Sequence, residues 1–149
     1  MKEIVMTIHI IAATFWVGGM LFMVLVLSPY VRKLPNYVHH FQEVGKRYSF
    51  WGTFLTLLIL FITGLYNMKV MGAPFPKVFS MNTTYAHTLS HKLYLFFTTV
   101  IIAVVHDYLL GLRAHKSEKI RKLSAVAGFI NLIIGILIVY LAVRLRFGG

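Results

Sequence analysis

The stretch that decides the fold is residues 4–27, which read IVMTIHIIAATFWVGGMLFMVLVL. This stretch contains no Asp, Glu, Lys or Arg, and it is longer than the ~20 residues that a helix needs to cross the hydrocarbon core of a bilayer. One side chain in it is unsuited to lipid, namely the imidazole of His9. Because ionisable groups inside a membrane are costly and rare, we expect His9 to have a function.

Three more apolar runs follow, at Phe50–Met68, Leu89–Leu110 and Ala125–Val143. The chain is 58% hydrophobic and only 13% charged, whereas soluble domains are usually about 45–50% apolar. The sequence therefore predicts an all-α, four-helix transmembrane bundle that forms a single domain over residues 1–149. The helices are expected at about residues 4–28, 48–69, 88–112 and 123–144.

The formal charge of +11 is distributed unevenly between the predicted connections. The first and third connections carry most of it, on Arg32, Lys33, Lys46, Arg47, Arg113, Lys116, Lys119, Arg121 and Lys122. By the positive-inside rule these connections face the cytoplasm, so both termini lie on the outer, periplasmic side of the inner membrane. Basic runs of this kind suit anionic lipid headgroups, and we expect no nucleic-acid binding.

The chain contains no cysteine. Disulfides, thiolate ligands, iron–sulfur clusters and cysteine-attached haem are therefore excluded. Any redox centre must be held by histidine, methionine or carboxylate side chains.

Two histidines, His91 and His106, lie near the two ends of the third apolar run. The first and third helices of such a bundle run in the same direction, so His9 and His91 should lie at a similar depth in the outer half of the bilayer. Two neutral imidazoles at one depth are suited to be the axial ligands of haem. We therefore predict that His9 and His91 hold the iron of haem b between the first and third helices.

Other side chains are expected to surround this haem. At 3.6 residues per turn, Ala13 and Trp16 share the face of His9, where the small Ala13 leaves room for the macrocycle and Trp16 caps it. Lys92 is expected to pair with a haem propionate. Tyr94, near the outer surface, is a candidate contact for a quinone.

His106 is about 22 Å from His91 along a helix with a rise of 1.5 Å per residue, which is too far for one metal ion. This spacing suits a second haem. Its other ligand on the cytoplasmic side is expected to be His40, or its neighbour His39. Both of these can equally be read as solvated loop residues.

Short motifs resemble a known family. Three motifs are similar to the CopD copper-resistance membrane proteins and the related HemJ-type protoporphyrinogen oxidases. They are His9-Ile10-Ile11 followed by Trp16-Val17-Gly18-Gly19, Phe61-Ile62-Thr63-Gly64-Leu65 at the end of the second helix, and His91-Lys92-Leu93 at the start of the third. The HemJ resemblance implies haem b bound through His9, with Lys92 as the matching lysine of the third helix. The fourth helix departs from the HemJ pattern, because it lacks the expected Asn-Glu-x-Pro-Thr-like entry.

The function predicted from these observations is that of a membrane b-type cytochrome. It would transfer electrons between a quinol or small oxidant and an acceptor. The identity of a redox partner protein and the formation of a homo-oligomer are left open. A CopD-like copper protein is the first alternative, since thioether and imidazole groups suit Cu(I). Its ligands would come from the outer connection, at Met68, Met71, Met81 and His87. A HemJ-like oxidase is the second alternative.

Overall fold

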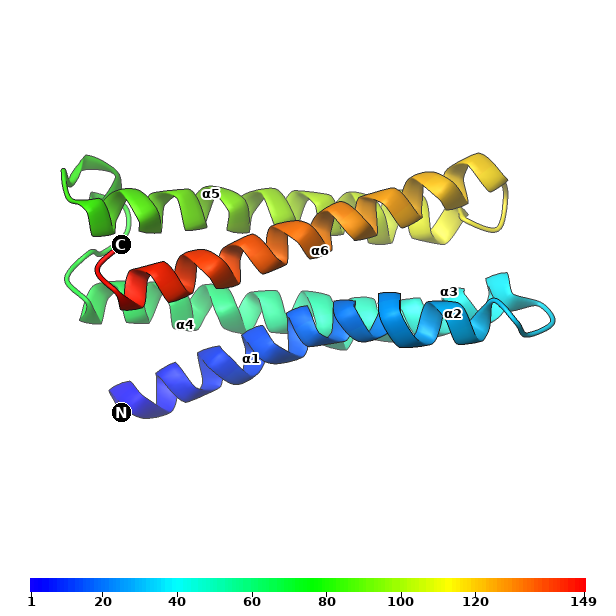
Figure 1. Ribbon diagram of the computed structural model, residues 1–149, viewed down its shortest axis with the longest axis horizontal. Coiled ribbons are helices and arrows are strands. Elements are labelled where there is room, and N and C mark those ends of the chain that lie inside the picture. Colours follow the sequence, from blue (N-terminus) through cyan, green and yellow to red (C-terminus); the bar gives the residue numbers. More distant parts are fainter.

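The fold is entirely helical and is built on four long helices, as the apolar runs predict (Figure 1). The computed structural model describes residues 1–149, apart from the side chain of residue 112. The backbone of these residues contains no strand. Each of the four helices is long and apolar enough to cross a membrane. The chain is therefore an all-α four-helix bundle with the character of a multi-pass membrane protein.

The first span runs without a break from Lys2 to Val31. It consists of α1 (Lys2–Phe22), the π-helical η1 (Met23–Leu27) and α2 (Ser28–Val31). A short turn then ends at Asn36, whose φ of 55° is left-handed. Asparagine tolerates this conformation better than most residues do, so the turn can lead directly into the next helix.

The second span begins much earlier than the sequence predicts. It consists of α3 (Tyr37–Tyr48), the π-helical η2 (Ser49–Leu55) and α4 (Thr56–Val70). The predicted start of this helix at residue 48 was wrong. The apolar run marks only the part of the helix that suits the bilayer core, whereas the preceding α3 is polar. Gln42 of α3 contacts His115 and Tyr37 lies under Arg121, so α3 is held by packing against the third connection.

The remaining elements are the 3₁₀ turn η3 (Lys77–Ser80), α5 (Thr84–Val104), the π-helical η4 (Val105–Leu110), the 3₁₀ turn η5 (Gly111–Arg113) and α6 (Glu118–Arg146). The helices α5 and α6 also start before the predicted residues 88 and 123. Side-chain caps explain both starts, since the hydroxyls of Thr83 and Ser117 accept hydrogen bonds from the N–H groups of Ala86 and Lys119.

Two helix pairs form the bundle. The helix α1 packs along α4, α5 packs along α6, and α6 also contacts α1 (Figure 1). The centre is filled by Trp16, Val17, Met20, Leu57, Leu60, Ala103, Leu132 and Ile138. Gly135 of α6 permits this packing, because a methyl group there would lie only 3.0 Å from Cε of Met20. Many large apolar side chains instead point outward, as lipid contact requires.

Tyr48 is wedged between two helices at the junction of α3 and η2. Its ring fills the space beside Gly19 of α1 and Gly52 of η2, where a methyl group on either glycine would overlap the ring. Its hydroxyl donates a hydrogen bond of 2.6 Å to the carbonyl oxygen of Trp16. Tyr48 therefore fixes the end of α3 against α1.

Both chain termini lie at one end of the bundle (Figure 1). A smaller apolar cluster closes this end, made of Met68, Ala73, Val78, Ala86 and Leu89. The backbone of Gly149 packs against that of Tyr85, at the start of α5. The prediction that the termini share one side is confirmed. That this side is periplasmic stays a prediction.

Candidate functional site

His9 is joined to the second span by a hydrogen bond. Its Nδ1 lies 2.7 Å from Oγ1 of Thr63 on α4. Oγ1 of Thr63 in turn lies 2.6 Å from the carbonyl oxygen of Ile59. A carbonyl oxygen can only accept, so the hydroxyl hydrogen of Thr63 is used on Ile59. The hydroxyl oxygen must therefore accept the Nδ1–H of His9.

This arrangement fixes the tautomer of the His9 ring. With the proton on Nδ1, the neutral imidazole carries an unshared electron pair on Nε2. No hydrogen-bond partner for Nε2 occurs among the described side chains. Gly64, which follows Thr63, lies beside the ring, and a methyl group there would lie 3.6 Å from Cε1. His9 is thus oriented like a metal ligand, which typically donates its other ring N–H to an oxygen atom.

Lys92 lies in the third span, on α5, and is half-buried. None of the ion pairs within the described part of the chain includes Lys92. An amine in this position has the chemistry to bind an anionic group.

His91 and Tyr94 have a different environment. Both are exposed on the outside of α5, although His91 is the immediate neighbour of Lys92. Successive helical residues point about 100° apart, so one of two neighbours can face the bundle while the other faces away. No hydrogen bond in the described part of the chain joins His9 to His91 or to Lys92. Of these two neighbours, Lys92 is half-buried and His91 is exposed.

Trp16 and Ala13 lie on the inner side of α1. Trp16 is only 1% exposed and stands at the centre of the apolar core, while Ala13 packs against that core. The buried Nε1–H of Trp16 has no acceptor within the described part of the chain. A buried donor left without a partner costs roughly 1–3 kcal/mol, so this group calls for an acceptor that the chain itself does not supply.

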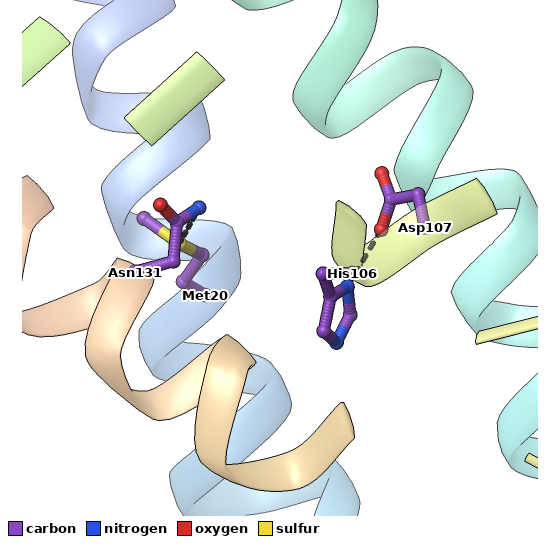
Figure 2. A network of polar contacts seen from close by, with 4 residues as sticks. All are labelled: Met20, His106, Asp107 and Asn131. Atoms are coloured by element: carbon purple, nitrogen blue, oxygen red, sulfur yellow. Dashed lines mark hydrogen bonds and ion pairs between the residues drawn. The ribbon is translucent and has the colours of Figure 1, made fainter. Parts of the chain in front are cut away.

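His106 forms a second pair at the other end of the bundle. Its Nδ1 lies 2.7 Å from Oδ1 of Asp107, and the side chain of Asp107 is only 14% exposed (Figure 2). A methyl group on Gly128 of α6 would lie 3.2 Å from Nε2 of His106. His40 is exposed on α3, and no described contact joins it to His106. The two residues proposed for a second haem therefore have separate surroundings.

A third polar group, in the middle of the bundle, was missed by the sequence analysis. Asn131 of α6 is hydrogen-bonded to Thr99 of α5, and its Nδ2 lies 3.9 Å from Sδ of Met20 (Figure 2). These contacts connect α1, α5 and α6. The signal was present in the sequence, because Asn131 is a lone amide in an apolar helix and must find a partner there.

The residues of the copper alternative differ in burial, and Met81 packs against the apolar cluster that contains Met68. Met68 is buried in the cluster that closes the termini end, whereas Met71 is exposed. His87 is exposed, and its Nε2 lies 3.3 Å from Oδ1 of Asn82. Met68 therefore serves packing, as methionine often does in apolar cores.

The comparisons with known proteins identify a relative without assigning an activity. No family model and no solved structure matches the chain, so the resemblance to CopD and HemJ proteins stays a prediction. A protein of Aquifex aeolicus (strain VF5), described as "Uncharacterized protein", is 45% identical over 150 residues. The match covers 99% of this chain and 97% of the relative. The chain therefore belongs to the same family as this Aquifex protein.

Proposed function

We propose that the protein binds haem b in the half of the bundle that holds the termini, with His9 as an axial ligand, and transfers electrons within the inner membrane. The observation that carries this proposal is the tautomer of His9. Thr63 uses its hydrogen on Ile59 and accepts the Nδ1–H of His9, which leaves Nε2 free to bind iron.

A second observation also fits a bound group. The Nε1–H of Trp16 is buried without an acceptor, on the same helix and two turns further in than His9. Seven residues span about 10 Å along a helix with a rise of 1.5 Å per residue. An acceptor bound at this depth, beside the macrocycle rather than on it, would satisfy this group.

Lys92 is the proposed contribution of α5. Its amine has no acidic partner among the described residues and is suited to hold a propionate. In its neutral form, the same amine could instead be a ligand of the haem iron. His91 is exposed on the outside of α5, which makes it the less suitable of the two neighbours for this site.

The chain's own residues would prepare and shield the cofactor. When bound, haem supplies one-electron redox chemistry. Thr63 holds the imidazole plane, and the apolar core around Trp16 keeps water away from the site. Burial and hydrogen bonding to the axial histidine are the means by which a protein sets the potential of its haem.

A membrane-borne electron donor can approach from the lipid. An apolar groove of about 440 Å³ lies between α1 and α4, and Ala12 and Ile59 are among the residues that line it. Ala12 lies three residues from His9, and Ile59 carries the carbonyl bonded to Thr63. We propose a quinol as the donor, since its isoprenoid tail suits such a groove.

The test is the absorption spectrum of detergent-purified protein, oxidised and then reduced with dithionite. We expect a Soret band that is lost in His9→Ala and retained in the matched His91→Ala variant. A Soret band of unchanged intensity in His9→Ala would overturn the assignment of the ligand. Protein that stays colourless after expression with added haem would overturn the function.

The two alternatives give different results in related experiments. A copper protein would bind stoichiometric Cu(I) and lose it on substitution of Met68, Met71 and His87. A HemJ-like oxidase would cause porphyrin to accumulate in cells that lack the protein, and its activity would require Lys92.

A further inference from the structure

Three side chains that can bind a metal converge near the start of α3. They are His39, His40 and Glu43, and their candidate ligand atoms all lie within 4.8 Å of one another. Nδ1 of His39 and Oε2 of Glu43 are 3.9 Å apart, and the two imidazole rings meet edge to face with centroids 6.2 Å apart. All three side chains are exposed. They lie at the end of the bundle opposite the chain termini (Figure 1).

The spacing is close to that of a bound ion. Zinc bonds imidazole nitrogen at about 2.0 Å and carboxylate oxygen at about 2.1 Å, so two ligand atoms of a tetrahedral site stand roughly 3.3 Å apart. His39 and Glu43 are four residues apart and therefore share one face of the helix. Small rotations of exposed side chains are sufficient to close the remaining distance.

The backbone that carries these side chains is fixed from its other side. Nε2 of Gln42 lies 3.1 Å from Nδ1 of His115 and 3.5 Å from the carbonyl oxygen of Gly111. The guanidinium group of Arg121 lies 5.8 Å from the centre of the Tyr37 ring. Because α3 is already held against the third connection, ion binding has to order only side chains, and this lowers its entropic cost.

The local charge indicates which ions suit the site. The same connection carries Arg32, Lys33, Lys46 and Arg47, so it does not attract cations by charge alone. Calcium and magnesium prefer several oxygen ligands, and only one carboxylate is present here. Two imidazoles and a carboxylate instead form coordinate bonds to ions such as Zn²⁺, Ni²⁺ and Cu²⁺.

We propose that His39, His40 and Glu43 bind a divalent transition-metal ion, with Zn²⁺ as the most suitable, and leave a coordination position open to water. Three protein ligands with an open position are typical of exchangeable or catalytic zinc sites rather than of closed structural ones. This site goes beyond the proposed haem function and does not depend on it, since the two lie at opposite ends of the bundle.

The test is Zn²⁺ binding to purified full-length protein that carries no polyhistidine tag, measured by competition with a chromophoric chelator. We expect one Zn²⁺ per chain. His39→Gln, His40→Gln and Glu43→Gln should each weaken binding roughly tenfold or more, since even outer-shell changes at metal sites cost about 10–100-fold. His87→Gln, which changes an exposed histidine of α5, should leave the affinity within about twofold of the unchanged protein, because it removes no ligand of the proposed site.

Several results would overturn the proposal. If a His39→Gln/His40→Gln double variant binds Zn²⁺ as tightly as the unchanged protein, the protein binds an adventitious ion only. Loss of binding in His9→Ala alone would move the zinc to the haem site. Far-UV circular dichroism shows whether each variant keeps its helices, so that weakened binding is assigned to lost ligands only where the helix content is unchanged.

Discussion

The two ends of the bundle each hold a histidine whose Nδ1 is hydrogen-bonded at 2.7 Å, yet the partners differ in kind. Near the termini, His9 of α1 donates to the neutral hydroxyl of Thr63 on another helix. At the opposite end, His106 pairs with the carboxylate of Asp107, its neighbour in η4. A hydroxyl partner suits a neutral ring, whereas a carboxylate also stabilises a charged one. The first contact therefore joins two spans, whereas the second lies within one.

The backbone differs between the two ends as well. The segments around His9, Thr63 and Lys92 are regular α-helix. The three π-helical segments η1, η2 and η4 all lie toward the opposite end, where the wedged Tyr48 is also found. Single π-helical turns are rare and occur frequently at functional sites. One half of the bundle is thus built from regular helices, whereas the other half is distorted and is held by a few specific contacts.

The largest effect is expected from Gly52→Ala, which tests how tightly the distorted half is held. The new methyl group would overlap the Tyr48 ring, which cannot shift easily because Gly19 lies on its other side and its hydroxyl is bonded to Trp16. We expect a loss of about 3 kcal/mol in the free energy of unfolding, at the upper end for overpacked cores. The measurement is unfolding in mixed detergent micelles.

The matched control is Gly45→Ala on α3, where nothing lies within 4 Å of the added methyl group. It should stabilise the protein by up to about 1 kcal/mol, because alanine is the better helix former. Equal destabilisation by the two substitutions would mean that Tyr48 is not wedged.

Asp107→Asn tests the carboxylate that is hydrogen-bonded to His106. The substitution keeps the shape of the side chain and removes its charge, so His106 loses a charge-assisted hydrogen bond in a poorly solvated place. We expect a loss of about 2 kcal/mol in the free energy of unfolding. The same micelle unfolding experiment measures it.

Glu118→Gln serves as the comparison for Asp107→Asn. The pair of Glu118 with Lys122 is exposed, so its removal should cost less than about 0.5 kcal/mol. If both substitutions have effects of that small size, the His106–Asp107 pair behaves as an ordinary surface pair.

Thr63→Val tests the neutral partner of His9. Valine has nearly the shape of threonine but cannot accept the Nδ1–H, and we expect a loss of about 1 kcal/mol in the free energy of unfolding. The Soret band should also weaken or shift, because the imidazole is no longer oriented. Thr63→Ser retains the hydroxyl and should preserve the spectrum. Identical spectra of the unchanged protein, Thr63→Val and Thr63→Ser would show that Thr63 does not orient the ligand.

The smallest effect is expected from His91→Ala. The side chain is exposed and has no described partner, so stability should change by less than about 0.5 kcal/mol. Thermal unfolding followed by circular dichroism is sufficient to detect a larger change. A large loss of stability, or loss of the Soret band, would indicate that His91 is a ligand after all. It would then be His91, rather than Lys92, that α5 contributes to the site.

The number of helices and the positions of the four apolar runs could be predicted from composition alone. The polar run His39–Lys46 allows an early start of the second span, but its exact start could not be predicted. The reason is that α3 is stabilised by contacts of Tyr37 with α6 and of Gln42 with the third connection rather than by its own apolarity. The sequence also singled out His9, and Thr63 lies in one of the motifs that carry the family resemblance, but the contact between the two was not predicted. A threonine hydroxyl can donate its hydrogen bond to a carbonyl of its own helix. The sequence pattern therefore does not show that Thr63 also accepts a hydrogen bond from a side chain of another helix.

The choice between His91 and Lys92 shows a more general limit. The two neighbours necessarily point about 100° apart, but a span that is apolar on all sides does not reveal which face is inward. Only the packing of α5 on α6 decides it. The same reason explains why the buried Nε1–H of Trp16, which depends on the packing of the core, could not be foreseen.

The π-helical form of η4 has a consequence for chain length. A turn closed from residue i to i+5 holds one residue more than an α-helical turn. Deleting Val105 should therefore leave α5 and α6 folded while rotating the rest of the third span by about 100°. In this shortened chain, His106 would no longer lie against Gly128, whereas the contact of His9 with Thr63 would be kept.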